Sequence, residues 1–537
     1  MRYIQKIKLI VTIMFLTIML CDCKKEIKLS AENSINLFYI RKISNQGLSE
    51  EVSFTVDEQK GEITGSILKW IDSQTPSKLI ARIEKADASS VTVNGINQVS
   101  GITVNDFSQT LNYRVKAENG NEKTYKVRII CPQINGSLPV VRINANDPIF
   151  SDDIYTKANL QLIGNGITEG LWDSFADGKM VEIRLRGNST MWLPKQPYRI
   201  KFPEKFSPFG LNHAKEKSWV LLANDADKTL LRNSVAFKAA KIMNDDPANN
   251  RFVPSTILVD LYLNGDYKGN YHLTDQVEVA TGRVNVESLK AADGNNPLKI
   301  TGGYLLEMDG FGETEPLYFK TKYKNLIATV KYPKDDDYDI SQYEYIKDYF
   351  GNQAESALFS DNFTDPATGW RKYFDEKTFI DYYIISELTG NPDSWWSTYI
   401  FKRRNDPLLY FGPIWDFDIA FNNDRRLGDV TRKLMATNAH DPKVWIQQFM
   451  KDSGFKKAVK LRWNNKKTEL LTLLDFTDQM VAKISLSQEA NFKRWNITTQ
   501  SLPQGATPPQ NYQLGVKQLK DYINARFTYL DGVFNSW

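Results

Sequence analysis

The sequence predicts a multidomain protein in which an all-β sandwich precedes an α+β module with a helical C-terminal part. Short alternating segments separated by turn residues fill the chain from about residue 29 to 130. From about residue 140, strand-like and helix-like segments alternate, and helical periodicity dominates residues 431–537. A chain of 537 residues has room for more than one such unit, at about 100–200 residues each.

Composition excludes several classes of protein. Hydrophobic residues make up 42% of the chain and charged residues 25%, which are ordinary globular values and exclude collagen-like, wholly disordered and polytopic membrane proteins. The 68 basic and 64 acidic residues leave a net charge of +4. That near balance argues against a nucleic-acid partner, because such proteins carry a strong basic excess.

The N-terminus predicts export. Basic residues precede an apolar run at residues 9–20, which is too short to span a bilayer comfortably and is typical of a signal peptide. Cys21 and Cys23 stand where a small-residue cleavage site is usual, and this junction resembles a bacterial lipoprotein signal. We expect residues 1–22 to be the signal peptide and Cys23 to carry the lipid. Asp22 departs from the small residue of that motif, so Cys21 or plain secretion remains open.

These features predict a protein that is exported and held to a bacterial membrane by a lipid anchor, at the cell surface or in the periplasm.

Residues 27–133 form the predicted β-sandwich, which resembles the immunoglobulin-like modules of bacterial surface lipoproteins. Its segments 52–56, 90–93 and 125–129 are short and alternating. A spacer or adhesion role is the primary interpretation, and carbohydrate binding is the alternative.

The α+β module is predicted at residues 139–537 and opens with basic strands. Val181, Ile183 and Leu185 alternate with charged residues up to Arg186, and a second segment alternates Tyr198, Ile200 and Phe202 with Arg199 and Lys201. Cations two residues apart on a strand point the same way, about 7 Å apart, which suits a polyphosphate. A solvated strand face is the alternative interpretation.

Two acidic residues follow a helix and a hairpin. Residues 378–388 predict a helix that stops at 389–392, so that Asp393 lies in the following loop. A hairpin then reverses the chain and leads to Asp416 and Asp418. Because the ends of a hairpin return to one sheet edge, we expect Asp393 and Asp416 in one cleft, the layout of a protein kinase. If extended, Asp416 and Asp418 share one face and suit Mg²⁺.

Several ordered motifs together resemble the CotH family, named for spore coat protein H. The resemblance spans the chain from about residue 140 into the C-terminal helices. It implies an atypical, protein-kinase-like domain that binds ATP with Mg²⁺ or Mn²⁺ and phosphorylates exported or cell-surface proteins. The motifs are residues 184–189, 194–202, 219–233, 260–265, 269–271, 302–309, 387–393 and 415–418.

The resemblance also implies a role for individual residues. Asp393 corresponds to the catalytic aspartate that orients the acceptor hydroxyl, with Asn391 shaping its loop, and Asp416 and Asp418 correspond to metal ligands. The predicted nucleotide-binding residues are Arg186, Lys195, Arg199, Lys201 and Glu307, the last as a buried acid that orients a cation.

The chain departs from ordinary kinases in two ways. It has neither a phosphate-binding G-x-x-x-x-G-K-[ST] loop nor a G-x-G-x-x-G loop. Thr398 stands where a typical kinase has a second metal-binding residue, so one or two metals remain open.

Two other functions fit the same residues. Asp393, Asp416, Asp418 and Glu387, with Trp395 and Trp396, could form the carboxylate cleft of a glycan-handling enzyme. A non-catalytic adhesin of kinase-like shape is the other alternative. The preferred prediction is metal-dependent transfer of phosphate from ATP to Ser or Thr of an exported protein.

Overall fold

The computed structural model describes residues 29–46, 48, 51–66, 75–86, 90–130, 138–164, 167, 169–171, 179–211, 215–245, 251–264, 266–440, 443–499 and 508–537. The predicted signal peptide, Cys23 after it, and residues 131–137 at the junction of the two predicted modules lie outside the described residues. No helix within these ranges combines the length and the hydrophobicity needed to cross a membrane.

The chain divides into two compact units near Ile129 and Ile130. The first unit is β-rich, as the sequence predicts, and its core includes Phe38, whose ring meets Phe54 and Tyr113 edge to face. An eight-stranded sheet has the order β5-β1-β2-β3-β10-β9-β6-β7, and β4 pairs with β8. The strands are β1 (Ile35–Ile40), β2 (Val52–Asp57), β3 (Glu62–Ser66), β4 (Leu79–Ile80), β5 (Arg82–Lys85), β6 (Ser90–Val93), β7 (Ile96–Asn97), β8 (Val104–Asn105), β9 (Leu111–Lys116) and β10 (Glu122–Ile130).

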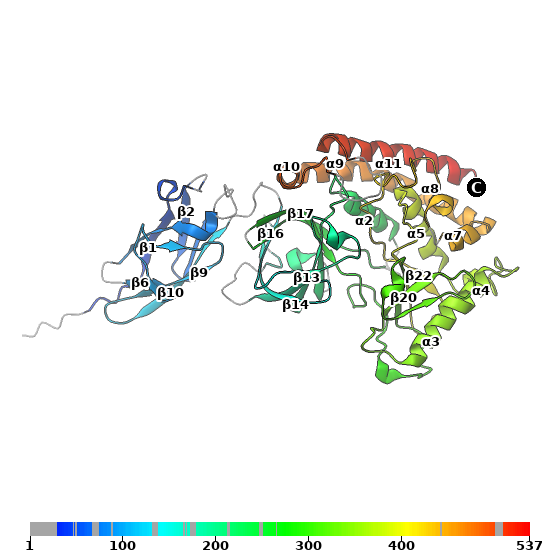
Figure 1. Ribbon diagram of the computed structural model, residues 1–537, viewed down its shortest axis with the longest axis horizontal. Coiled ribbons are helices and arrows are strands. Elements are labelled where there is room, and N and C mark those ends of the chain that lie inside the picture. Colours follow the sequence, from blue (N-terminus) through cyan, green and yellow to red (C-terminus); the bar gives the residue numbers. More distant parts are fainter. Residues whose placement is uncertain are drawn as a thin grey trace, which may run out of the picture. The chain divides into compact units, whose positions relative to one another are not determined.

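The second unit opens with a closed barrel of order β11-β12-β13-β14-β15-β17-β16 (Figure 1). Its pairs are antiparallel except for β11 with β16, where Val140 lies opposite Asp260 in parallel register. The predicted alternation is confirmed, because the apolar residues of β13 and β14 lie in the barrel core. The strands are β11 (Val140–Ala145), β12 (Thr156–Ile163), β13 (Met180–Leu185), β14 (Tyr198–Phe206), β15 (Glu216–Leu222), β16 (Thr256–Leu263) and β17 (Asp266–Asp275).

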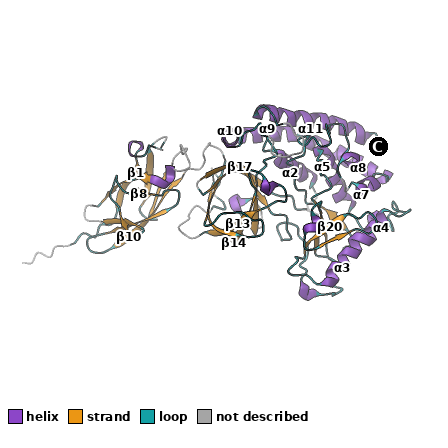
Figure 2. Ribbon diagram, viewed as in Figure 1, coloured by secondary structure: helices purple, strands orange, loops and turns teal. Residues whose placement is uncertain are grey.

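A separate five-stranded sheet of order β19-β20-β18-β21-β22 contains the predicted hairpin. Every residue of β18, β21 and β22 is buried, which is expected where both faces of a sheet are covered. Figure 2 shows helices beside this sheet, and the two share one hydrophobic core. The strands are β18 (Tyr304–Met308), β19 (Tyr318–Lys320), β20 (Ile327–Tyr332), β21 (Thr398–Lys402) and β22 (Leu409–Phe411).

Helices dominate the end of the chain, as predicted, and α5 packs against α2, α8 and α11. A π-helical turn, Tyr349–Ala354, joins α3 to α4. The helices are α2 (Arg232–Met243), α3 (Ile340–Asp348), α4 (Glu355–Leu358), α5 (Glu376–Thr389), α6 (Met435–Asn438), α7 (Val444–Phe449), α8 (Ser453–Leu471), α9 (Leu473–Lys483), α10 (Ser485–Arg494) and α11 (Tyr512–Asn535).

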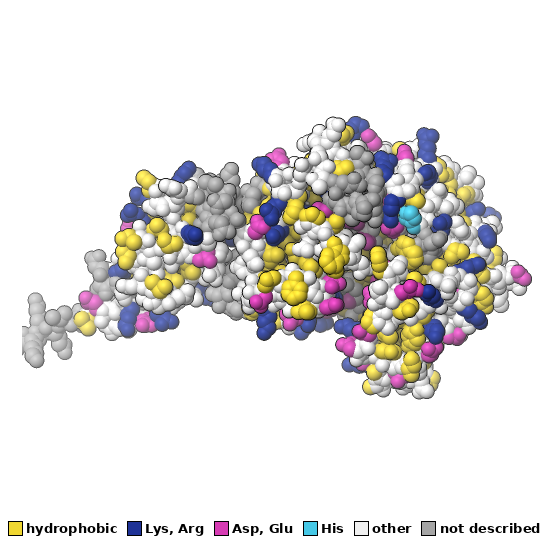
Figure 3. Space-filling model, in the orientation of Figure 1, with side chains coloured by type: hydrophobic (Ala, Val, Ile, Leu, Met, Phe, Trp, Pro, Cys, Tyr) yellow, Lys and Arg dark blue, Asp and Glu magenta, His cyan; other side chains and the backbone are white. Residues whose placement is uncertain are grey.

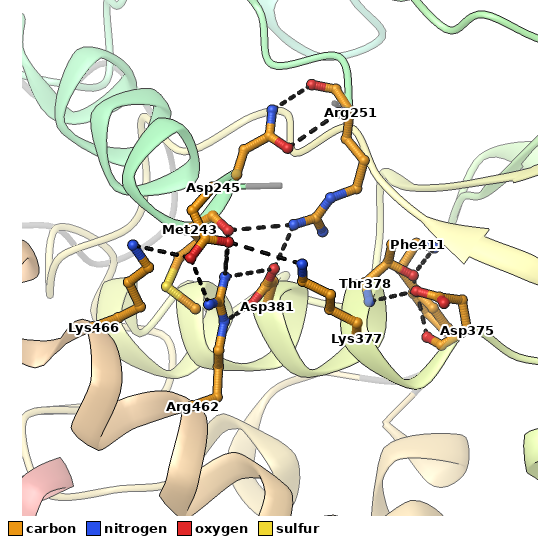
Figure 4. Close-up of polar contacts among 11 residues, drawn as sticks. Met243, Asp245, Arg251, Asp375, Lys377, Thr378, Asp381, Phe411, Arg462 and Lys466 are labelled. Carbon is orange, nitrogen blue, oxygen red and sulfur yellow. Dashed lines mark hydrogen bonds and ion pairs between the residues drawn. The ribbon is translucent and has the colours of Figure 1, made fainter. Parts of the chain in front are cut away.

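A buried carboxylate ties three of these helices together (Figure 4). Asp381 of α5 pairs with Arg251 and accepts from Arg462 Nε of α8 at 2.7 Å. Arg462 also binds Asp245, just beyond α2, and Lys466 pairs with Asp245 at 3.1 Å. Because each acid has more than one cation, this network fixes α5 with respect to α2 and α8.

On the face seen in Figure 3, basic and acidic side chains are interspersed, in keeping with the small net charge. The basic side chains discussed below therefore act locally, since charges farther apart than a Debye length of about 8–10 Å are largely screened.

Candidate active site

Helix α5 ends at Gly390, a position that only glycine can occupy. Gly390 has a φ of +56°, and its N–H donates to Ser386 O at 3.0 Å. A Cβ at this position would lie 2.2 Å from Tyr522 Oη of α11. The left-handed residue turns the chain sharply, so Asn391 and Asp393 follow directly after the helix.

Asn391 fastens the Asp393 loop to Asp416. Its side chain is buried, and its Oδ1 accepts from the N–H of Asp393 at 3.1 Å. Its Nδ2 donates to the backbone carbonyl oxygen of Asp416 at 3.1 Å. One amide group therefore spans the two loops that the hairpin β21–β22 brings back to the same place.

The segment carrying Asp416 rests on the first turn of α2. Asn233 Oδ1 accepts from the N–H of Phe417 at 2.8 Å, and Arg232 Nε donates to Ala420 O at 3.1 Å. Asp416 has a φ of +69°, so it is not extended, and the condition under which Asp416 and Asp418 would share one strand face is not met. The left-handed residue breaks the alternation on which that expectation depended.

The carboxylates nevertheless lie close enough to affect one another. Asp416 is exposed to solvent, yet surrounding protein raises its pKa by desolvation, and the charges of Asp393 and Asp309 raise it further while Arg186 opposes them. Burial and the charge of Asp416 raise the pKa of Asp418 to about 8. A carboxylate that is exposed yet destabilised in its ionised form is a candidate for ligand binding.

Arg186 is the predicted cation whose charge acts on Asp416. Its guanidinium lies over the Trp415 ring, 5.6 Å from the centroid. Burial lowers its pKa, and the charges of Asp416, Tyr399 and Glu307 favour its protonated form. The Arg186 guanidinium is therefore within electrostatic range of both Asp416 and Glu307, the buried acid of β18.

Glu307 is buried, as predicted, and has a cation that the sequence did not single out. Its carboxylate pairs with Lys331 Nζ of β20 at 3.1 Å, and burial raises its pKa. Lys331 also pairs with Glu315 at 2.9 Å. The pair joins adjacent strands, where no local sequence pattern reports it.

The other three predicted phosphate ligands have partners of their own. Lys195 is buried, donates to Asn270 O at 2.6 Å, and has a pKa that burial lowers to about 7. Arg199 donates to Ser218 Oγ at 3.2 Å and lies 3.7 Å from Glu278. Lys201 is exposed and pairs with Glu182 at 3.1 Å.

An arginine that the sequence analysis missed contacts Asp393. Arg426 Nη2 donates to Asp393 Oδ2 at 2.7 Å and lies 2.6 Å from Asp424 Oδ2. Asp424 is buried, and its Oδ1 also accepts from the N–H of Arg426 at 2.8 Å. Burial opposes the charge of Arg426, but the hydrogen bonds to Asp393 raise its pKa overall. This arrangement fixes the Asp393 carboxylate from one side.

The donor set fits a hard divalent cation shared with a ligand. The raised pKa values of Asp416 and Asp418 mean that the protein disfavours their ionised forms. A bound cation would stabilise those ionised forms. Within the described ranges, no three acidic, His or Cys side chains converge into a complete metal site. Mg²⁺ is commonly held by one or two carboxylates plus substrate phosphates, so two aspartates suffice.

Glu387 and Trp395 have structural roles. Glu387 is fully buried, pairs with Arg526 at 2.9 Å, and accepts from the N–H groups of Met435 and Ala436. Trp395 is buried and stacks on Tyr383 at 6.4 Å. The glycan-handling alternative therefore loses its fourth carboxylate and one of its two stacking surfaces.

Comparison with known proteins gives a family match and weak similarities to solved structures. The family described as CotH kinase protein matches residues 183–530, and no curated protein matches. Among solved structures, a Bacteroides fragilis protein described as secreted is 16% identical over 18% of this chain and 94% of its own, with a TM-score of 0.14. A Bacteroides thetaiotaomicron protein described as a glycoside hydrolase is 17% identical over 26% of this chain and 36% of its own, with a TM-score of 0.16. These two structural similarities are too low to bear on function.

Proposed function

Because this chain belongs to the CotH kinase protein family, we propose that it is a metal-dependent kinase acting on exported or cell-surface proteins. It transfers the γ-phosphate of ATP to a Ser or Thr hydroxyl. The observation that carries the proposal is the Asn391 bridge, which holds the loop of Asp393 against the backbone of Asp416. Phosphoryl transfer requires an acceptor-orienting group and a metal-holding group in one site.

The residues divide the chemistry between them. The acceptor oxygen attacks the γ-phosphorus, the bond from that phosphorus to the β–γ bridging oxygen breaks, and ADP leaves. Asp393 orients the hydroxyl and accepts its proton through the carboxylate oxygen that Arg426 does not hold. Arg426 acts here as a positioning residue, because its own geometry is fixed by buried Asp424.

Asp416 and Asp418 hold the metal, which when bound neutralises phosphate charge during transfer. Arg186 is the first candidate for a phosphate contact, because it already lies within electrostatic range of Asp416 and Glu307. Arg199 is the second candidate for a phosphate contact, because it is near enough for its charge to lower the pKa of Arg186. Lys195 would first have to leave its bond with Asn270, and Lys201 its pair with Glu182.

The location of the enzyme is part of the proposal. The apolar run at residues 9–20 and the cysteines after it support export and lipid anchoring at Cys23. Metabolic labelling with a radioactive fatty acid tests this. Label should be lost in Cys23→Ser and kept in Cys21→Ser, and the reverse result would move the anchor to Cys21.

The kinase assignment is tested by binding and transfer measured on the same proteins. Calorimetry with ATP and Mg²⁺ or Mn²⁺ should show binding that Asp416→Asn weakens and Asp393→Asn preserves. Transfer of labelled γ-phosphate should fall at least about 100-fold in both variants. Asp361→Asn, a change at an exposed aspartate of the same unit, is the matched control and should behave as wild type.

Two results would count against the assignment. Equal binding heats for wild type and Asp416→Asn would remove the metal role of Asp416. ATP binding without transfer to any exported protein would favour the adhesin alternative.

A further inference from the structure

Side chains from α11 and from Asn422 hold the main chain of residues 424–433 in place by hydrogen bonds to its backbone groups. Arg526 of α11 is fully buried, and its Nη1 donates to the carbonyl oxygens of Val430 at 3.0 Å and Lys433 at 2.7 Å. Asn422 closes the loop before them, because its Oδ1 accepts from the N–H of Val430 at 3.1 Å. With its main chain tied inward in this way, residues 424–433, here called the basic segment, expose part of their side chains.

Most of the charged side chains in the basic segment are already used. Arg426 binds Asp393 and Asp424, and Lys433 Nζ donates to Leu427 O at 2.6 Å. Asp429 accepts from Thr431 Oγ1 at 2.6 Å and from Asn422 Nδ2 at 3.1 Å, and these bonds lower its pKa, with a smaller contribution from the charge of Arg425.

Arg425 and Arg432 are the two cations that remain. Both are exposed, and neither has an acidic partner within 4.0 Å among the residues that the structure describes. They lie in the same short segment as Arg426, which touches Asp393. Two exposed guanidinium groups are therefore held on the fixed backbone of the segment whose Arg426 contacts Asp393.

We propose that the basic segment selects an acidic acceptor polypeptide, in which Asp or Glu residues flank the phosphorylated Ser or Thr. The inference rests on the proposed kinase function and adds the class of its substrate. Arginine binds carboxylates with paired, directed hydrogen bonds, and clusters of arginine are a recurring means of recognising acidic segments. Rigid presentation favours this binding, because little side-chain and loop ordering is left to be done on association.

The surroundings of Arg425 leave room for a bound chain. Arg425 lines a cavity of about 920 Å³ between the basic segment and α11. Asp521 on the α11 side is paired with Lys517 at 2.6 Å, so its charge is compensated.

A binding experiment tests the proposal without requiring catalysis. Fluorescein-labelled peptides with one Ser flanked by Glu, by Gln or by Lys are titrated with the full-length protein, and anisotropy gives the affinity. The Glu peptide should bind most tightly, and high salt should weaken it most. The double variant Arg425→Glu/Arg432→Glu should weaken its binding about ten-fold or more, with little effect on the Gln peptide.

Matched variants separate local contact from overall charge. Lys457→Glu places a new acid on an exposed site of α8, whose Phe455 stacks on Phe379 at the opposite end of α5 from Asp393, and should leave peptide affinity unchanged. Arg425→Lys/Arg432→Lys should keep most of the preference. Equal affinity for the three peptides would overturn the inference. So would loss of ATP binding in the Arg425→Glu/Arg432→Glu variant, since the arginines would then serve the nucleotide.

The kinase assignment and this inference fail in different ways. Acidic peptides that bind but are never phosphorylated would contradict the kinase assignment and keep the binding surface. Phosphorylation of peptides without preference for acidic flanks would keep the kinase and remove the surface.

Discussion

Asn391 Nδ2 donates to the backbone carbonyl oxygen of Asp416 across 3.1 Å, and Asn391 Oδ1 accepts from the N–H of Asp393 at the same distance. The backbones of two aspartates far apart in sequence are thus both hydrogen-bonded to one side chain. The position of Asp393 relative to Asp416 therefore depends on an amide that takes no part in the chemistry.

Asn391→Ala should reduce phosphoryl transfer much more than stability. Losing two partly buried hydrogen bonds costs about 1–3 kcal/mol of unfolding free energy, whereas misplacing Asp393 by about 1 Å can cost on the order of 100-fold in rate. Urea unfolding and transfer kinetics measure the two effects. Asn352→Ala, which removes a bond to exposed Asp348, should change neither by much. Equal activity of Asn391→Ala and wild type would show that the bridge is dispensable.

Arg426→Ala should lower the rate of transfer with little effect on ATP binding, because Arg426 contacts Asp393 rather than the predicted metal ligands. Guanidinium ion added to the solution should restore part of the rate, since the vacated site keeps the Asp393 and Asp424 carboxylates. Lys457→Ala, at an exposed site of α8, is the control for a general loss of positive charge and should leave the rate unchanged, with or without guanidinium. A variant that loses rate but never responds to guanidinium would indicate only a structural defect.

Arg526→Met should destabilise the protein by about 3–5 kcal/mol, because it leaves the fully buried Glu387 carboxylate without its cation. Adding Glu387→Gln should recover part of this loss, since the remaining carbonyl and N–H groups no longer surround an unpaired charge. Urea unfolding of both single variants and the double variant gives the coupling. Strictly additive losses would mean that the pair is not the source of the effect.

Asp260→Asn should alter the pH dependence of stability. Burial raises the pKa of Asp260 to about 6, and its Oδ1 already accepts from Tyr267 and Ser487. A raised pKa means that the folded state binds this proton more tightly. The ionised Asp260 carboxylate therefore destabilises the folded protein above pH 6. This cost disappears as the pH falls below the pKa of the group in the unfolded chain, near 4.

The stability of Asp260→Asn relative to wild type should therefore rise by about 3 kcal/mol between pH 4 and pH 7. Urea unfolding across this range measures it. The exposed Asp361→Asn change should give a flat difference. A flat difference for Asp260→Asn as well would show that the carboxylate is solvated in the folded protein.

Local sequence patterns predict the secondary-structure elements that position the site. Gly390 ends α5 where the turn residues indicate, and the hairpin β21–β22 lies where two apolar runs flank residues 403–408. Glu307 is buried on β18 because its neighbours along the strand are all apolar. Each of these features depends on residues adjacent in the chain.

Features that depend on distant residues were missed. Arg426 and Arg526 bind groups brought to them by tertiary structure, and neither lies in a pattern that separates it from surface arginines. Lys195 looked like an open cation but lies buried against Asn270 of β17. Asp416 has a left-handed φ, and the next residue, Phe417, is hydrogen-bonded to Asn233 of α2; strand periodicity indicates neither.

The parallel pairing of β11 with β16 has a practical outcome for anyone preparing a shortened protein. The family match starts at residue 183, inside β13, after β11 and β12 have already passed. A fragment cut there would open the ring of strands, leaving β13 and β16 with bare edges prone to aggregation. Because Arg186 directly follows β13, such a fragment would also loosen the cation whose charge acts on Asp416, so preparations should begin before Val140.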